Sequence, residues 1–148
     1  MTGVVIVTHY RLAEEFLQAV QLIVGELPHF GAIGLDPSES PEAMRARIEK
    51  TIREAEQGDG VLVLVDMFGG TPSNLCLSFL EEDRIEVVTG LNLPMLVKVA
   101  RLREGQPLRA VAELARDSGQ RNISVASEVL AGRSPGRMPP PASPESDG

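Results

Sequence analysis

Five consecutive apolar residues, Val61–Val65, constrain the fold of this chain more than any other feature. The run does not alternate with polar side chains, which is typical of a strand covered on both faces, as in a parallel sheet. Apolar and β-branched runs at Val4–Thr8, Phe30–Leu35 and Ile85–Thr89 predict three more strands. Because segments with helical periodicity separate these runs, we expect an α/β fold with helices on both faces of a mostly parallel sheet.

The predicted helices begin at recognisable signals. Apolar residues recur at spacings of three and four over Arg11–Val24, which is one face of a helix. The dipeptides Ser40-Pro41 and Thr71-Pro72 each place a hydroxyl before a proline. A hydroxyl in the cap position followed by proline in the first turn predicts a helix start.

The C-terminal part of the chain predicts two helices, a last strand and a tail. The helices are expected at 95–102 and 108–115, the second closed by Gly119. Residues Asn122–Ser127 alternate apolar and polar side chains, which predicts a fifth, edge or partner-facing strand. Residues 133–148 are rich in proline and serine and predict a disordered tail, because they cannot bury enough apolar surface to offset the entropy of ordering. We therefore expect one folded domain, residues 1–132.

Composition excludes several classes of protein. The chain has 148 residues, a net charge of -7 and only 3% aromatic residues. Excess negative charge and few flat rings disfavour a nucleic-acid partner. The single cysteine, Cys76, excludes an internal disulfide. No apolar run approaches the roughly 20 residues of a membrane span, and the N-terminus shows no basic export signal, so we expect a cytoplasmic protein with no direct membrane insertion.

Polar residues that suit chemistry follow the predicted strands directly. His9 follows the first strand, Asp66 the third, and Asn92 the fourth. The carboxyl ends of parallel strands meet at one edge of the sheet, where sites form near the point at which the strand order reverses. A carboxylate on one imidazole nitrogen fixes the tautomer and leaves the other nitrogen free to attack. Taken singly, either residue could serve in an ordinary loop or turn, so the prediction depends on their combination.

A glycine-rich turn follows Asp66. Gly69 and Gly70 allow positive φ and close approach of a ligand to the backbone. Thr71 adds a hydroxyl, and the start of the next helix adds amide donors with partial positive charge. This combination predicts a site for a phosphoryl-sized anion beside His9, and therefore phosphoryl transfer onto histidine. The sequence shows no metal-ligand cluster.

Three segments resemble the mannose-family enzyme IIA domain of the bacterial phosphoenolpyruvate-dependent sugar phosphotransferase system. They are Thr8-His9, the stretch from Asp66 to Asn74 (DMFGGTPSN), and the stretch from Thr89 to Leu96 (TGLNLPML). The resemblance covers roughly residues 1–130. It implies a five-stranded α/β domain that forms a homodimer, with the last strand antiparallel and exchanged between subunits.

The resemblance also implies a mechanism. His9 would accept a phosphoryl group from the phosphocarrier protein HPr and pass it to a IIB protein or domain during sugar uptake. Asp66 would orient His9, and Gly69, Gly70 and Thr71 would hold the phosphoryl oxygens. No cofactor or metal would take part. The chain departs from the family pattern at Tyr10, where small residues commonly follow the histidine.

Other functions stay open at this stage. The same residues would suit a regulatory module that senses phosphoryl state without passing the group onward. The phosphotransfer subunit of dihydroxyacetone kinase is a close relative of this kind of domain, but it usually continues into further domains. A flavodoxin-like or receiver-like module is less consistent with the sequence, because His9 stands where a receiver needs an acidic pair and few aromatic rings are available for a flavin.

Overall fold

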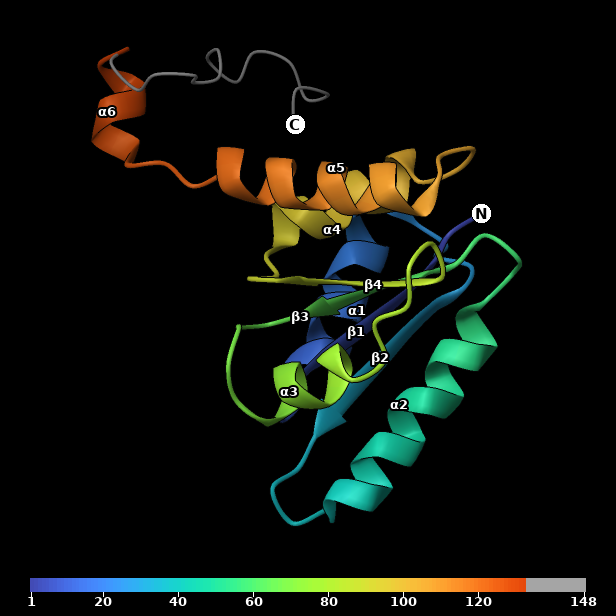
Figure 1. Ribbon diagram of the computed structural model, residues 1–148. Coiled ribbons are helices and arrows are strands. Elements are labelled where there is room, and N and C mark those ends of the chain that lie inside the picture. Colours follow the sequence, from blue (N-terminus) through green and yellow to red (C-terminus); the bar gives the residue numbers. More distant parts are fainter. Residues whose placement is uncertain (133–148) are drawn as a thin grey trace.

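The computed structural model describes residues 1–132, and the tail predicted at 133–148 lies outside the described residues. Strands and helices alternate through most of the chain (Figure 1). The elements are β1 Gly3–His9, α1 Leu12–Val24, β2 Phe30–Leu35, α2 Pro41–Ala55, β3 Val61–Val65, α3 Thr71–Leu77, β4 Ile85–Thr89, α4 Leu93–Leu102, α5 Leu108–Arg121 and α6 Ala126–Leu130.

The four strands form one parallel sheet in the order β2-β1-β3-β4. Val5 lies beside Gly31 of β2 on one side and Val63 of β3 on the other. The chain leaves β1 toward β2 and then crosses back to β3, so the strand order reverses between β1 and β3. This is the position at which open α/β sheets bind their ligands.

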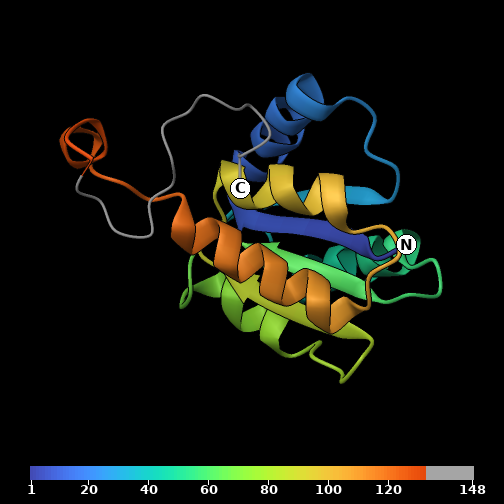
Figure 2. The ribbon, with the colours of Figure 1, turned by 90° about the horizontal axis from the view of Figure 1, so that it is seen from above.

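Successive side chains of the central strands point to opposite faces, and each face has its own core. Val4, Ile6, Leu62 and Leu64 pack in a cluster with residues of α1, α4 and α5. The alternate valines of β1 and β3 pack in a second cluster with residues of α2 and α3. Figures 1 and 2 show α4 and α5 on one side of the sheet, and Figure 1 shows α2 and α3 on the other. Helices on both faces were predicted and are confirmed.

The helix boundaries follow the sequence signals with two corrections. Ser40 caps α2 as predicted, since its hydroxyl accepts a hydrogen bond from the Ala43 amide at 3.1 Å. Thr71 was predicted to cap α3, but it is the first helical residue and Gly70 takes the cap position. Gly119 does not end α5, which continues to Arg121, and the missing side chain instead lets Met95 of α4 pack closely against the helix.

The predicted fifth strand is wrong for the part of the chain that the structure describes. Residues 122–125 follow α5 without regular structure, and Ala126–Leu130 forms the short helix α6. Ile123 and Val125, whose alternation suggested a strand, are 75% and 58% exposed. An alternating pattern needs a neighbouring strand and a core to become a strand. α6 stands away from the domain in both ribbon views, and β4 is left as an edge strand.

Candidate functional site

His9 and Asp66 meet at the carboxyl end of the two central strands. The Asp66 carboxylate lies 2.9 Å from His9 Nδ1 through its Oδ2 atom, and the same oxygen accepts the His9 backbone amide at 2.9 Å. Its other oxygen accepts the amide of Met67 at 3.0 Å. The Asp66 side chain is 12% exposed and that of His9 is 48% exposed. The carboxylate is therefore held from several directions, while the ring it orients stays accessible.

Neighbouring elements fix the turn that carries His9. The hydroxyl of Thr8, which is fully buried, accepts the Ala13 amide at 2.7 Å and so ties the end of β1 to α1. The amide of Tyr10 donates to the Leu35 carbonyl at 2.9 Å and ties the turn to β2. With the Asp66 contact from β3, the turn is bonded to elements on both sides of β1. The imidazole is thus presented on a fixed backbone.

Gly70 lies on the Nε2 side of the imidazole. A Cβ atom added at Gly70 would lie 3.3 Å from His9 Nε2, and the residue has φ 96°. Any other residue would be strained there and would crowd the ring. Gly69, at φ 84°, donates its amide to the Ser73 hydroxyl at 3.2 Å. The glycine-rich loop therefore brings its backbone to the Nε2 side of His9.

Ser73 is the residue of this site that sequence reasoning missed. Its side chain is fully buried beneath the loop and accepts the Gly69 amide, so this amide already has a partner. The signal was a hydroxyl residue four positions after Gly69, within the first turn of α3. Thr71, by contrast, is exposed at the start of that helix. The first turn of a helix leaves amides without intrahelical partners, and Pro72 has no amide to contribute.

Asn92 and Cys76 have structural roles. The Asn92 side chain accepts the Met95 amide at 3.0 Å and donates to the Gly119 carbonyl at 3.1 Å, so it caps α4 and joins it to α5. Cys76 is buried, and this burial, with a smaller contribution from the charge of Asp66, raises the pKa of its thiol to about 12. A thiol with this pKa stays protonated and does not act as a nucleophile near neutral pH.

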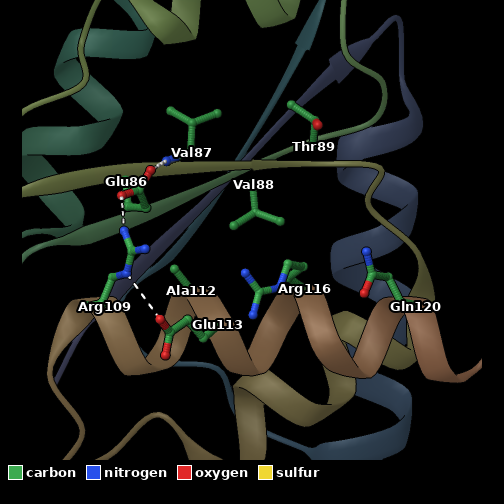
Figure 3. A pocket seen from close by; sticks show the side chains of 9 residues that line it. All are labelled: Glu86, Val87, Val88, Thr89, Arg109, Ala112, Glu113, Arg116 and Gln120. Carbon is green, nitrogen blue, oxygen red and sulfur yellow. Dashed lines mark hydrogen bonds and ion pairs between the residues drawn. The ribbon is translucent and has the colours of Figure 1, made fainter.

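A separate groove of about 380 Å³ runs between β4 and α5 (Figure 3). Arg109 lies within it. Its Nη1 atom is 3.9 Å from Oε1 of Glu86 on the strand, and its Nε atom is 3.2 Å from Oε2 of Glu113 on the same helix. None of the residues that line this groove belongs to the His9 site.

Among residues 1–132 no group of His, Cys, Asp and Glu side chains is arranged to hold a metal ion. None of the helices in this range is long and apolar enough to cross a membrane.

At the site, a partly exposed imidazole stands beside a backbone loop with positive φ and a carboxylate bonded to its Nδ1 side. Nδ1 faces Asp66, Nε2 lies on the side of Gly70, and the His9 side chain is about half exposed to solvent. In the neutral tautomer whose Nδ1–H donates to the carboxylate, Nε2 keeps its lone pair. This is the arrangement that nucleophilic catalysis by histidine requires.

Comparison with known proteins identifies the domain. A family profile described as "PTS system fructose IIA component" matches residues 3–116. The chain is 30% identical to the fructose-specific EIIA component of Bacillus subtilis over 131 residues, covering 88% of this chain and 90% of that one. It is 29% identical to the mannose-specific EIIAB component of Escherichia coli over 152 residues, covering 96% of this chain and 47% of the relative. The chain thus spans about half the length of that relative.

Solved structures give the same result. The mannose/sorbose-specific IIA subunit from Enterococcus faecalis superposes with a TM-score of 0.75 at 28% identity, covering 84% of this chain and 93% of that one. The resemblance to mannose-family IIA domains, first suggested by three short motifs, is therefore confirmed over most of the chain. The chain belongs to the family of fructose and mannose IIA components of the bacterial phosphotransferase system.

Proposed function

We propose that this protein is a phosphoryl carrier that takes a phosphoryl group onto His9 Nε2 and passes it to a second protein. The observation that carries the proposal is the 2.9 Å contact between His9 Nδ1 and Asp66, because it leaves Nε2 as the free nucleophile. Membership of the IIA family supports a transferase role.

In the forward step, the Nε2 lone pair forms a bond to phosphorus while the bond from phosphorus to the donor's imidazole nitrogen breaks. The donor nitrogen leaves with that bond's electron pair, so no water or oxidant is needed. The proton on Nδ1 of His9 stays hydrogen-bonded to Asp66, whose charge stabilises the positive charge that develops on the ring. Transfer to the acceptor repeats the step with His9 as the leaving group.

The glycine-rich loop is proposed to hold the phosphoryl oxygens. A side chain at Gly70 would reach to 3.3 Å from Nε2, so this glycine keeps the space beside Nε2 open, and Thr71 stands exposed at the start of α3. The Thr71 hydroxyl and the amides of the first helical turn are the donors we assign to the oxygens. Because Ser73 already occupies the Gly69 amide, we assign Gly69 a conformational role, which its positive φ requires.

HPr is the proposed phosphoryl donor and a IIB protein or domain the proposed acceptor in sugar uptake. The E. coli relative is named as a mannose-specific EIIAB component, and the B. subtilis relative as a fructose-specific EIIA component. We further propose a cytoplasmic location and a homodimer. The open edge of β4 and the exposed side chains of Ile123 and Val125 support association between copies.

Labelling with phosphoenolpyruvate, enzyme I and HPr tests the proposal. The native chain should acquire an acid-labile, base-stable phosphate, and His9→Ala should acquire none while keeping its circular dichroism spectrum. Label that persists in His9→Ala would overturn the assignment.

A chase separates carriage from regulation. When purified phosphorylated protein is mixed with IIB proteins, a carrier loses its label to at least one of them. A regulatory phospho-acceptor keeps its label in the presence of every IIB protein, and that result would favour the regulatory alternative.

A further inference from the structure

Tyr10 has a backbone conformation that its residue type disfavours. Among residues 1–132 only three non-glycine residues have positive φ, and Tyr10, at φ 50°, is the one beside the candidate nucleophile. A side chain in this left-handed region is strained, and such strain collects at functional sites. Only glycine would adopt this conformation without strain. The side chain that Tyr10 carries there is therefore a candidate for a role at the site.

The neighbouring strand enforces this conformation. Tyr10 donates its amide to the Leu35 carbonyl at 2.9 Å. Its carbonyl oxygen occupies the space that a side chain would need at Gly34, so only glycine fits there. β2 thereby holds the Tyr10 backbone on one side of β1, while Asp66 draws the His9 ring toward β3 on the other. The Tyr10 backbone and the His9 ring are therefore held from opposite sides of β1.

The Tyr10 side chain forms a flat, exposed surface with Arg11. The ring is 54% exposed, and the Arg11 guanidinium lies 4.9 Å from its centroid. The stacking orders two side chains that would otherwise move freely in solvent. Tyrosine and arginine are also the residue types most enriched among the energetically dominant contacts of protein interfaces. The pair therefore presents a preformed contact surface next to His9.

We infer that Tyr10 and Arg11 are specificity-determining residues that dock the phosphohistidine protein which donates to His9. The inference rests on the proposed function. The phosphorus of the donor must reach Nε2, so the donor's surface must cover the residues adjoining His9. The Arg11 cation provides attraction for a phosphoryl-bearing surface on a chain whose net charge is -7.

Steady-state transfer from phospho-HPr tests this inference against labelling by phosphoramidate, a small donor that needs no docking surface. Tyr10→Gly removes the ring and accepts φ 50° without strain, so the fold should be kept. We expect it to raise KM for phospho-HPr about tenfold, with kcat and the phosphoramidate rate unchanged. Tyr10→Phe keeps the ring and should retain the native KM.

The contribution of the Arg11 charge to docking is tested with a separate variant. Arg11→Gln should raise KM for phospho-HPr about threefold at low salt and less at high salt. Arg109→Gln, which removes an exposed cation in the β4 groove, is the matched control and should leave KM unchanged.

Two results would overturn the inference. One is a native KM for phospho-HPr in Tyr10→Gly. The other is an equal loss with phospho-HPr and phosphoramidate, which would mean that Tyr10 acts by positioning His9. The proposed function is judged independently, because it fails if the native chain takes no label from phospho-HPr.

Discussion

The polar side chains at the two ends of the parallel sheet differ in how deeply they are buried and in how many of their hydrogen-bonding groups have partners. At the amino end, Arg103 is 3% exposed, and its guanidinium donates to the Thr2 carbonyl at 2.9 Å and to the Pro28 carbonyl. It also lies 4.6 Å from the centroid of the Phe30 ring. At the carboxyl end, the His9 side chain is 48% exposed and only its Nδ1 side is held, by Asp66.

From this difference we expect the amino end of the sheet to contribute to stability and the carboxyl end to carry the reactive group. A buried cation must have its donors satisfied, and those of Arg103 join the segments before β1 and β2 to the end of α4. Burial lowers the pKa of the Arg103 guanidinium, because it disfavours the charged form. The His9 end instead leaves one nitrogen open and holds the adjoining Tyr10 in a strained conformation. Changes at one end should alter folding, and changes at the other should alter transfer.

Asp66→Asn should give the largest effect on transfer. The amide removes the charge that supports the phosphorylated ring and leaves one of the donors now bound by the carboxylate without an acceptor. We expect the rate of phosphorylation to fall about 100-fold with both phospho-HPr and phosphoramidate. Rapid-quench labelling measures the rate, and the urea unfolding midpoint serves as control. A rate within about threefold of native would remove Asp66 from the mechanism.

Arg103→Met should give the largest effect on folding. Methionine keeps the apolar stem but leaves the Thr2 and Pro28 carbonyls without their guanidinium donors, so we expect a loss of about 2 kcal/mol in the free energy of unfolding. Urea denaturation followed by circular dichroism measures it. The folded variant should be phosphorylated at the native rate, because Arg103 lies at the opposite end of the sheet. A slower phosphorylation rate at urea concentrations where the variant is still folded would contradict the proposal that the two ends of the sheet act separately in folding and in transfer.

Ser73→Ala should have smaller effects, on both the stability of the fold and the rate of phosphorylation. The variant removes the hydroxyl that accepts the Gly69 amide, which we expect to cost about 1 kcal/mol in stability. The loop beside Nε2 becomes less ordered, and the phosphorylation rate should fall about threefold. Ser73→Thr keeps the hydroxyl and is the matched control. If Ser73→Ala matched the native protein in both measurements, the hydroxyl would have no role in holding the loop.

The central strands could be predicted from the sequence because buried parallel strands are continuous apolar runs. All residues of Val61–Val65 are buried. Once this strand was predicted, its end also predicted that Asp66 lies near His9. The alternation of strands and helices predicted the layers. The same reasoning failed at Asn122–Ser127, because a period of two shows which residues share a face and not whether a partner strand exists.

Features that depend on tertiary contacts could not be predicted. Arg103 looks like an ordinary surface residue at the end of an amphipathic helix, and its burial depends on carbonyls supplied by Thr2 and Pro28, far away in the sequence. The positive φ of Tyr10 is imposed by β2. Ser73 has a role only because the loop folds back over it. In each case the sequence shows the residue type, and the fold supplies its partner.

The nitrogen that carries the phosphate tests the central claim most directly. Two-dimensional ¹H–¹⁵N correlation spectra of uniformly ¹⁵N-labelled, phosphorylated protein distinguish Nδ1-phosphohistidine from Nε2-phosphohistidine, and His9→Ala assigns the signal to its residue. Because Asp66 holds Nδ1 at 2.9 Å, the phosphate should be on Nε2 of His9, with Nδ1 protonated. Phosphate on Nδ1, or on any residue other than His9, would contradict the account.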